Sequence, residues 1–244
     1  MSERLLIQGD SLPLPRGPVP YEETWPWHLR VDDRFPHVIN RSQSGKTTDE
    51  LHTDKVRFPR RKLELYEPET VVMQIGIVDC APRLLSKTER DLITAFPFET
   101  LARVSSYAAK RLRGRTRRRT YVSEGEFEAN LRDYLERADE HGIDHLVVLK
   151  ILTAGEKYTA KNPDVQEAIT TYNEIIDRLA DEFPFVQSLR PLATSKPEEE
   201  SLVDDHTLED GYHLNAAGHE RLYERLLEES PLGQPQPTAT MADD

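Results

Sequence analysis

Short apolar runs that alternate with longer segments of helical periodicity constrain the fold of this chain more than any other feature. Several of these runs are rich in Val, Ile and Leu rather than alternating with polar residues, as in parallel strands covered on both faces. Strands that alternate with helices predict an α/β domain with a parallel sheet. The five runs are Arg4–Gln8, His37–Asn40, Thr70–Ile75, His145–Leu149 and Phe185–Leu189.

The segments between the runs carry the apolar spacing of helices. In Glu124–His141, for example, Phe127, Leu131 and Leu135 recur at helical spacing, which places them on one face. Pro13–Trp27 is an exception, because its five prolines are incompatible with a helix and predict an ordered loop. The other expected helices are Thr47–Val56, Ser86–Arg113, Asp164–Phe183 and Ala216–Leu227.

The length of 244 residues suits one domain with a full hydrophobic core. We expect that domain to span residues 1–229, with a basic helical insertion near residues 86–120. The tail over residues 230–244 contains Pro231, Pro235 and Pro237, and we expect it to be disordered.

Composition and charge indicate a protein of the cytoplasm. Apolar residues make up 37% of the chain and charged residues 31%, and no stretch approaches the roughly 18 apolar residues of a membrane helix. The charged Ser2-Glu3-Arg4 leads directly into the first strand, so no signal peptide is expected. The net charge of −12 argues against general nucleic-acid binding. It fits either adaptation to high salt or an ordinary acidic cytosolic protein.

The sequence predicts neither a metal ion nor a cofactor. The single cysteine, Cys80, excludes an internal disulfide and a zinc framework. No cluster of histidine and cysteine has the spacing of metal ligands, and no glycine-rich loop of the kind that cradles phosphate is present.

A basic run stands out in this acidic chain. Lys110–Arg119 contains seven basic residues in ten. Such a run is most often a solvated helix end or hairpin, and the alternative is a docking patch for an anionic partner. A nucleic-acid partner is disfavoured, because no aromatic residue that could stack on bases is interleaved with the charges.

Two short segments at opposite ends of the chain carry the residues of a candidate active site. Gly9-Asp10-Ser11-Leu12 follows the first strand, and ligands of parallel sheets bind at the carboxyl ends of strands. Asp210-Gly211-Tyr212-His213 precedes the last helix. A serine nucleophile, a histidine base and an orienting carboxylate are the groups that acyl transfer needs. Structural alternatives are a turn serine at Ser11 and a helix N-cap at Asp210.

These residues make the chain resemble the GDSL or SGNH hydrolase family. Gly9–Leu12 matches the first block of the family literally, Gly45 stands in the loop that corresponds to its second block, and Asp210 and His213 match its last block. The resemblance implies a flavodoxin-like three-layer α/β/α fold with a five-stranded parallel sheet. It also implies an esterase, lipase, thioesterase or deacetylase with Ser11, His213 and Asp210 as catalytic residues. The backbone N–H groups of Ser11 and Gly45 would then form the oxyanion hole.

The third block departs from the family pattern, which is Gly-x-Asn-Asp. This chain has Gly76-Ile77-Val78-Asp79, so Val78 replaces the asparagine that would donate to the oxyanion. Losing one such donor typically costs roughly 10²–10³ in rate. Another side chain could replace it, with Asn40, Gln43 or Lys46 nearest in sequence. Otherwise the backbone donors act alone, or the protein is slow or inactive on ordinary esters.

The resulting prediction is a serine hydrolase that cleaves an ester of a small acyl group, carried by a carbohydrate or another polar molecule. Its partner is then a small-molecule or glycan ester, and the tryptophans of Pro13–Trp27 suit the wall of the substrate site. One alternative is an acyltransferase with the same three residues. Another is a non-catalytic binding protein on this fold, which the replacement at Val78 would favour.

Two further side chains carry expectations. Arg83 follows the third block, and a structural ion pair is favoured there over contact with an anionic substrate group. His219 lies on the last helix and is expected to face solvent.

Overall fold

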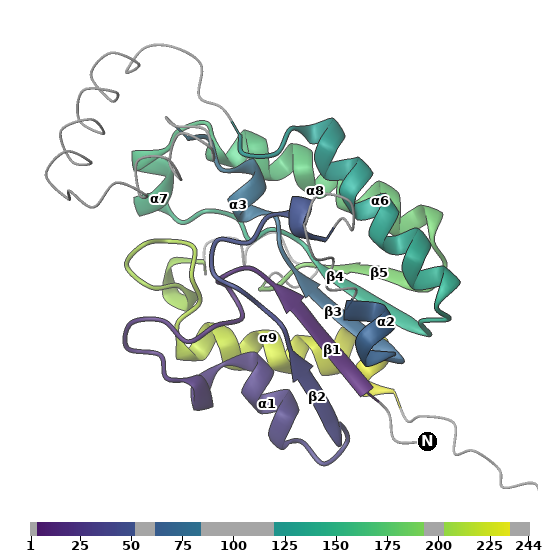
Figure 1. The fold of residues 1–244 in the computed structure, drawn as a ribbon. Coiled ribbons are helices and arrows are strands. Elements are labelled where there is room, and N and C mark those ends of the chain that lie inside the picture. The colour runs from purple at the N-terminus through teal and green to yellow at the C-terminus, as the bar shows by residue number, and fades with distance from the viewer. Residues whose placement is uncertain (1–3, 52–61, 84–119, 193–202, 235–244) are drawn as a thin grey trace, which may run out of the picture.

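The computed structural model describes residues 4–51, 62–83, 120–192 and 203–234, and they form a five-stranded parallel sheet with the order β2-β1-β3-β4-β5 (Figure 1). The predicted α/β class is confirmed. Each predicted run overlaps one strand, and no strand end differs from its prediction by more than one residue. The strands are β1 Arg4–Gly9, β2 His37–Asn40, β3 Thr70–Gln74, β4 His145–Leu149 and β5 Val186–Leu189.

The three long α-helices of the described ranges, over residues 124–140, 165–182 and 216–229, were predicted, whereas the shorter α-helices were not. Predictions over Ser86–Arg113, over the basic insertion and over Lys110–Arg119 fall outside the described residues. The predicted helix Thr47–Val56 is a 3-10 turn where it is described. The α-helices are α1 Trp25–Val31, α2 Lys62–Tyr66, α3 Ile77–Cys80, α6 Glu124–Glu140, α7 Glu156–Lys161, α8 Val165–Glu182 and α9 Ala216–Glu229. The 3-10 turns are Tyr21–Glu23, Thr48–Glu50, Asp204–His206 and Pro231–Gly233.

Helices cover both faces of the sheet, so the strands are buried on each side. In Figure 1, α6 and α8 lie on one face and α1 and α9 on the other. Successive side chains of a strand point to opposite faces, and on β1 Leu6 packs toward α6 and α8 while Leu5 and Ile7 pack toward α1 and α9. This two-sided burial explains why the strands read as continuous apolar runs.

The prediction that Pro13–Trp27 contains no helix is wrong at its end. Helix α1 begins at Trp25 with Pro26 in its first turn, where a missing N–H breaks no helical hydrogen bond. Trp25 is fully buried, and its indole N–H donates to Gln74 Oε1 at 2.9 Å. It packs with Leu29 against the sheet. Trp25 is therefore a core residue rather than part of a substrate wall.

The packed domain also continues past the predicted boundary at residue 229. Pro231–Gly233 forms a 3-10 turn, and Leu232 is buried against the α1 and α9 side of the core. The remaining predicted tail, residues 235–244, lies outside the described ranges. Among the helices of the described ranges, none has the length and apolar character needed to cross a bilayer.

The strand order places the candidate site. From β1, the chain moves to β2 on one side and then to β3 on the other. Such a switch point opens a crevice at the carboxyl ends of the strands, where open parallel sheets bind ligands. The two strand ends are tied together there, because Asp10 N–H donates to Gln74 O at 3.0 Å. Ser11 follows β1 and Val78 follows β3, so both lie at this edge.

Candidate active site

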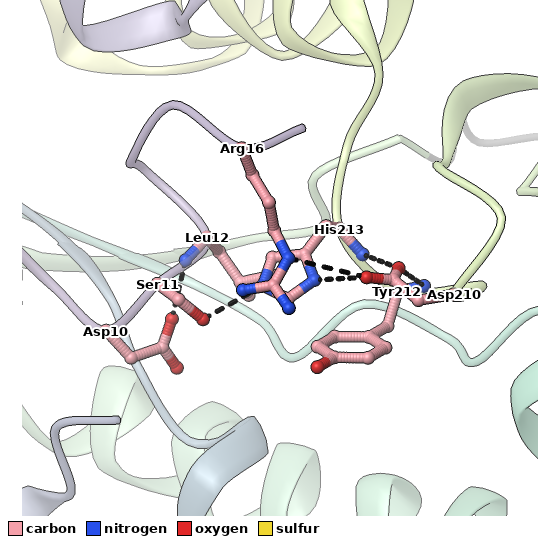
Figure 2. A network of polar contacts seen from close by, with 7 residues as sticks. All are labelled: Asp10, Ser11, Leu12, Arg16, Asp210, Tyr212 and His213. Carbon is pink, nitrogen blue, oxygen red and sulfur yellow. Dashed lines mark hydrogen bonds and ion pairs between the residues drawn. The ribbon is translucent and has the colours of Figure 1, made fainter. Parts of the chain in front are cut away.

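Ser11, His213 and Asp210 form one continuous chain of hydrogen bonds. Ser11 Oγ lies 2.9 Å from His213 Nε2, and His213 Nδ1 lies 2.7 Å from Asp210 Oδ2. Figure 2 shows the side chains of Ser11, His213 and Asp210 following one another. A carboxylate only accepts hydrogen bonds, so it favours the tautomer with the proton on Nδ1. His213 Nε2 is then left as an acceptor for the hydroxyl of Ser11.

The loop before α9 holds Asp210 and His213 in place. Asp210 Oδ1 accepts the backbone N–H of His213 at 3.1 Å and of Tyr212 at 3.3 Å. The carbonyl of His213 accepts from Leu208 N–H at 2.7 Å. The N-cap of α9 is Asn215, so Asp210 does not cap this helix. Its two oxygens instead fix the backbone and the imidazole of the same turn.

The electrostatics of these groups suit a neutral base beside an ionised carboxylate. Burial lowers the pKa of His213, although the hydrogen bond and charge of Asp210 oppose that shift. Partial burial disfavours ionisation of Asp210, but hydrogen bonds from His213 outweigh it and lower the pKa of the carboxyl. Arg16 Nε lies 3.6 Å from Asp210 Oδ2, and its positive charge further lowers the pKa of His213.

Asp10 supports the serine turn from below. Its side chain is fully buried, and Oδ1 accepts the backbone N–H of Leu12 at 2.9 Å (Figure 2). Burial raises the pKa of Asp10 to about 7 against the effect of that hydrogen bond. The carboxyl therefore braces the turn in which Ser11 is presented, without contacting the serine hydroxyl itself.

The loop after β2 offers a backbone donor near its turn. Lys46 N–H donates to Gln43 O at 3.2 Å, and Gly45 occupies the left-handed region at φ 75°. A positive φ at the third position of such a turn favours glycine. Within the described ranges, the N–H groups of Ser11 and Gly45 donate to no other protein group. Both remain available to a ligand.

The three side chains considered as replacements for the missing asparagine have different surroundings. Val78 is buried in the apolar core. Lys46 is only 2% exposed, and its ammonium is engaged by Gln8 Oε1, to which it donates at 2.9 Å. Gln43 is exposed. Asn40 Oδ1 accepts the backbone N–H of Ser42 at 3.0 Å, and a donor role for the Asn40 amide stays a prediction.

An aromatic wall that sequence reasoning missed adjoins the histidine. The ring centroid of Tyr212 lies 4.2 Å from that of His213, and that of Tyr158 on α7 lies 4.7 Å from Tyr212. Tyr212 lies inside the Asp-x-x-His segment, so its position beside His213 could have been predicted from the local sequence. Tyr158 had no such local signal, because it approaches only through the packing of α7.

Two expectations about single side chains are wrong. No carboxylate of the described ranges pairs with Arg83, whose guanidinium lies over the Tyr121 ring at 4.9 Å. His219 does not face solvent but is 2% exposed, where its Nδ1 accepts Trp25 N–H at 3.4 Å. Burial lowers the pKa of His219 to about 4. No group of three or more metal-ligating side chains occurs among the described residues.

Known proteins resemble this chain in sequence pattern and in fold. Residues 8–221 match the model of the GDSL-like lipase/acylhydrolase family, whereas no curated protein matches significantly. A lipase/acylhydrolase from Enterococcus faecalis is similar with a TM-score of 0.60 and 16% identity, over 93% of this chain and 94% of that one.

Two solved esterases share the same fold. The acetyl-xylooligosaccharide esterase Axe2 from Geobacillus has a TM-score of 0.60 and 17% identity, over 96% of this chain and 95% of its own. Esterase EstA from Pseudoalteromonas, solved inhibited by monoethylphosphonate, has a TM-score of 0.53 and 16% identity, over 93% and 95%. Since the family model spans most of the sequence and the sheet is that of solved relatives, the chain belongs to the GDSL-like lipase/acylhydrolase family.

Proposed function

We propose that this protein is a serine esterase that cleaves small acyl groups from a carbohydrate or another polar carrier through an acyl-serine intermediate. The observation that carries the proposal is the hydrogen-bonded chain from Ser11 through His213 to Asp210. These three groups supply a nucleophile, a base and a carboxylate that orients the base.

The first half of the reaction forms the acyl-enzyme. Ser11 Oγ attacks the ester carbonyl while His213 Nε2 takes the hydroxyl proton. Asp210 stabilises the imidazolium that results and keeps its tautomer. The backbone N–H groups of Ser11 and Gly45 are the proposed donors to the oxyanion. His213 then returns the proton to the leaving alcohol as the carbon–oxygen bond breaks.

The second half releases the acyl group. His213 removes a proton from water, which attacks the acyl carbonyl, and then protonates Ser11 Oγ as the acid leaves. A sugar hydroxyl in place of that water would make the same groups an acyltransferase. The choice of a small acyl group on a polar carrier is supported by likeness to an acetyl-xylooligosaccharide esterase.

The test measures two properties of the same protein samples. Wild type is expected to hydrolyse 4-nitrophenyl acetate and to be labelled by a fluorophosphonate, which mimics the tetrahedral intermediate. Ser11→Ala is expected to lose both. Ser188→Ala is the matched control, because the hydroxyl of Ser188 on β5 bonds to Asp177 and lies outside the proposed site.

The two readouts separate the alternatives. Labelling of Ser11 without hydrolysis would favour an acyltransferase that excludes water or a narrow substrate. Folded wild type that is neither labelled nor active would overturn the proposal and favour the binding protein suggested by Val78.

A further inference from the structure

A stack of aromatic rings leads from His213 to the positive charge of Arg83. The His213, Tyr212 and Tyr158 rings contact one another in sequence. Burial raises the pKa of both phenols, and the charge of Arg83 opposes that shift in Tyr158 and in Tyr212 alike. The guanidinium therefore lies within electrostatic reach of both rings.

Packing rather than an ion pair holds Arg83. Its guanidinium lies over the Tyr121 ring at 4.9 Å. Next to it, Pro82 O accepts from the side chain of Asn162 at the end of α7. The hydrogen bond to Pro82 ties the segment that carries Arg83 to the end of α7, and α7 carries Tyr158. Stacking of a guanidinium on an aromatic face restricts its motion without neutralising its charge.

The charge of Arg83 has no counterion in the described part of the chain. Its Nε is buried and without a hydrogen-bond partner there, and no carboxylate lies within ion-pair distance. Several other arginines of the fold are paired, such as Arg132 with Glu182 and Arg178 with Glu128. A partly buried guanidinium that keeps open donors matches an incoming carboxylate or phosphate.

Because the net charge of the chain is negative, the positive charge of Arg83 contrasts with most of the protein. The net charge of −12 disfavours the approach of an anion to most of the surface. Beside Tyr212, however, two positive charges act from different parts of the chain, because Arg16 also lowers the pKa of that phenol. Of these two arginines, Arg16 pairs with Asp210, whereas Arg83 pairs with no carboxylate of the described ranges.

We propose that Arg83 is a specificity-determining residue that binds a negatively charged group of the ester substrate, a carboxylate or phosphate a few bonds from the scissile carbonyl. The inference rests on the proposed esterase function and narrows its substrate class. The aromatic faces of Tyr212 and Tyr158 would line the path between the ester and the anion.

The experiment compares neutral and anionic esters, with the spontaneous hydrolysis of each ester subtracted. The values of kcat/KM are measured for 4-nitrophenyl acetate and 4-nitrophenyl succinate, in which the charge lies on the acyl side. Phenyl acetate and 4-acetoxybenzoate place the charge on the alcohol side. Arg83→Gln is expected to lower kcat/KM for one anionic ester about tenfold or more, as loss of a charged hydrogen bond does. The neutral partner should change less than about twofold.

Two variants serve as controls. Arg178→Gln removes the same charge from an exposed position on α8, so it reports any general effect of net charge. Arg83→Lys keeps the charge without the planar fork, and it is expected to recover part of the preference for the anionic ester. Equal loss for neutral and anionic esters, or no loss for either, would overturn the inference.

A binding measurement keeps the inference separate from the proposed chemistry. Calorimetric titration of Ser11→Ala with monomethyl succinate is expected to show binding that is weakened about tenfold in Ser11→Ala/Arg83→Gln. Undetectable binding, or equal binding to both variants, would contradict an anion-binding role of Arg83 on the acyl side of the ester. Binding that depends on Arg83 in a protein without esterase activity would refute the proposed function while supporting the anion site.

Discussion

At the scale of single residues, the candidate active site combines three hydrogen-bonded groups with one missing donor. Ser11, His213 and Asp210 have the distances that proton transfer and orientation need. Val78, in contrast, offers no side-chain donor where the family pattern has asparagine. The hydrogen-bonded groups favour catalysis, whereas the missing donor lowers the rate. A pH profile tests the first feature, and a substitution at Val78 tests the second.

Restoring the donor at position 78 should raise activity. We expect Val78→Asn to increase kcat for 4-nitrophenyl acetate by about 10–100-fold, because one added oxyanion donor is worth up to 10²–10³. Val78→Leu adds volume but no donor and is the control. The amide is introduced into an apolar core, so thermal unfolding must show that the variant is folded. An unchanged kcat in a folded Val78→Asn would indicate that another donor already fills the role.

The pH profile should report the buried imidazole. Burial lowers the pKa of His213 from the ordinary histidine value of 6.5, and only the neutral ring can act as a base. The acid limb of kcat/KM is therefore expected below pH 6.5, with activity lost as the pH falls through the pKa of His213. Steady-state rates from pH 4 to 9 with a neutral ester measure it. An acid limb above pH 7 would contradict this account of the imidazole environment.

At the scale of elements, the site depends on how β3 passes into α3. Gly76 makes that connection at φ 130°, which side chains disfavour. A Cβ at this position would lie 2.7 Å from Ile151 Cδ1, just after β4. The glycine therefore lets the third loop approach the chain that follows β4, and this contact sets where Val78 and Asp79 stand.

A side chain at position 76 should disturb that junction. We expect Gly76→Ala to lower the free energy of unfolding by about 2–4 kcal/mol, through the unfavourable φ and the clash with Ile151. Ile151→Ala removes the clashing atoms, so the double variant should be less destabilised than the sum of the single ones by about 1 kcal/mol or more. Urea unfolding of all four proteins measures this coupling. Strict additivity would refute the steric part of the explanation.

At the scale of the whole molecule, buried ionisable groups beneath the strand ends link stability to pH. Burial raises the pKa of Asp10 and of Asp79 to about 7. Asp79 Oδ1 accepts the backbone N–H and the hydroxyl of Thr48. Burial lowers the pKa of Lys46 to about 7. The fold therefore holds several groups whose charged forms it disfavours.

Asp10→Asn tests whether the buried Asp10 carboxyl makes the folded protein less stable as the pH rises. A carboxyl whose pKa is higher in the folded state binds more protons there, so folding stability falls as the pH rises from about 4 to 7. Asparagine removes this loss while its side-chain oxygen can still accept from Leu12. We expect the stability of the variant relative to wild type to improve by about 2 kcal/mol between pH 5 and 8.

Taking the difference between two proteins removes the opposing effect of His219, whose lowered pKa makes stability rise with pH over part of the same range. Asp181→Asn, at an exposed position on α8, controls for the loss of one negative charge. Urea unfolding at each pH gives the two curves. Parallel curves for wild type and Asp10→Asn would contradict the raised pKa of Asp10.

The strands and the long helices were predictable because their signals are local. Apolar runs buried on two faces give the five strands, and the spacing of Phe127, Leu131 and Leu135 gives α6. Helix α1 was missed because Pro26 was read as incompatible with a helix. In the first turn, however, a missing N–H breaks no helical hydrogen bond. The buried state of His219 was missed because its face of α9 packs against α1, which no local pattern reports.

The sequence by itself determined the order of elements, the two faces of the sheet and the proximity of Asp210 to His213, since these depend on residues close together in the chain. Only the tertiary structure decided the contact between Ser11 and His213, which are 202 positions apart. It alone also placed Tyr158 beside Tyr212 and left Arg83 without a counterion in the described ranges. Such contacts arise where helices and loops pack at the sheet edge, and that packing follows from the summed burial of the whole core rather than from any local period.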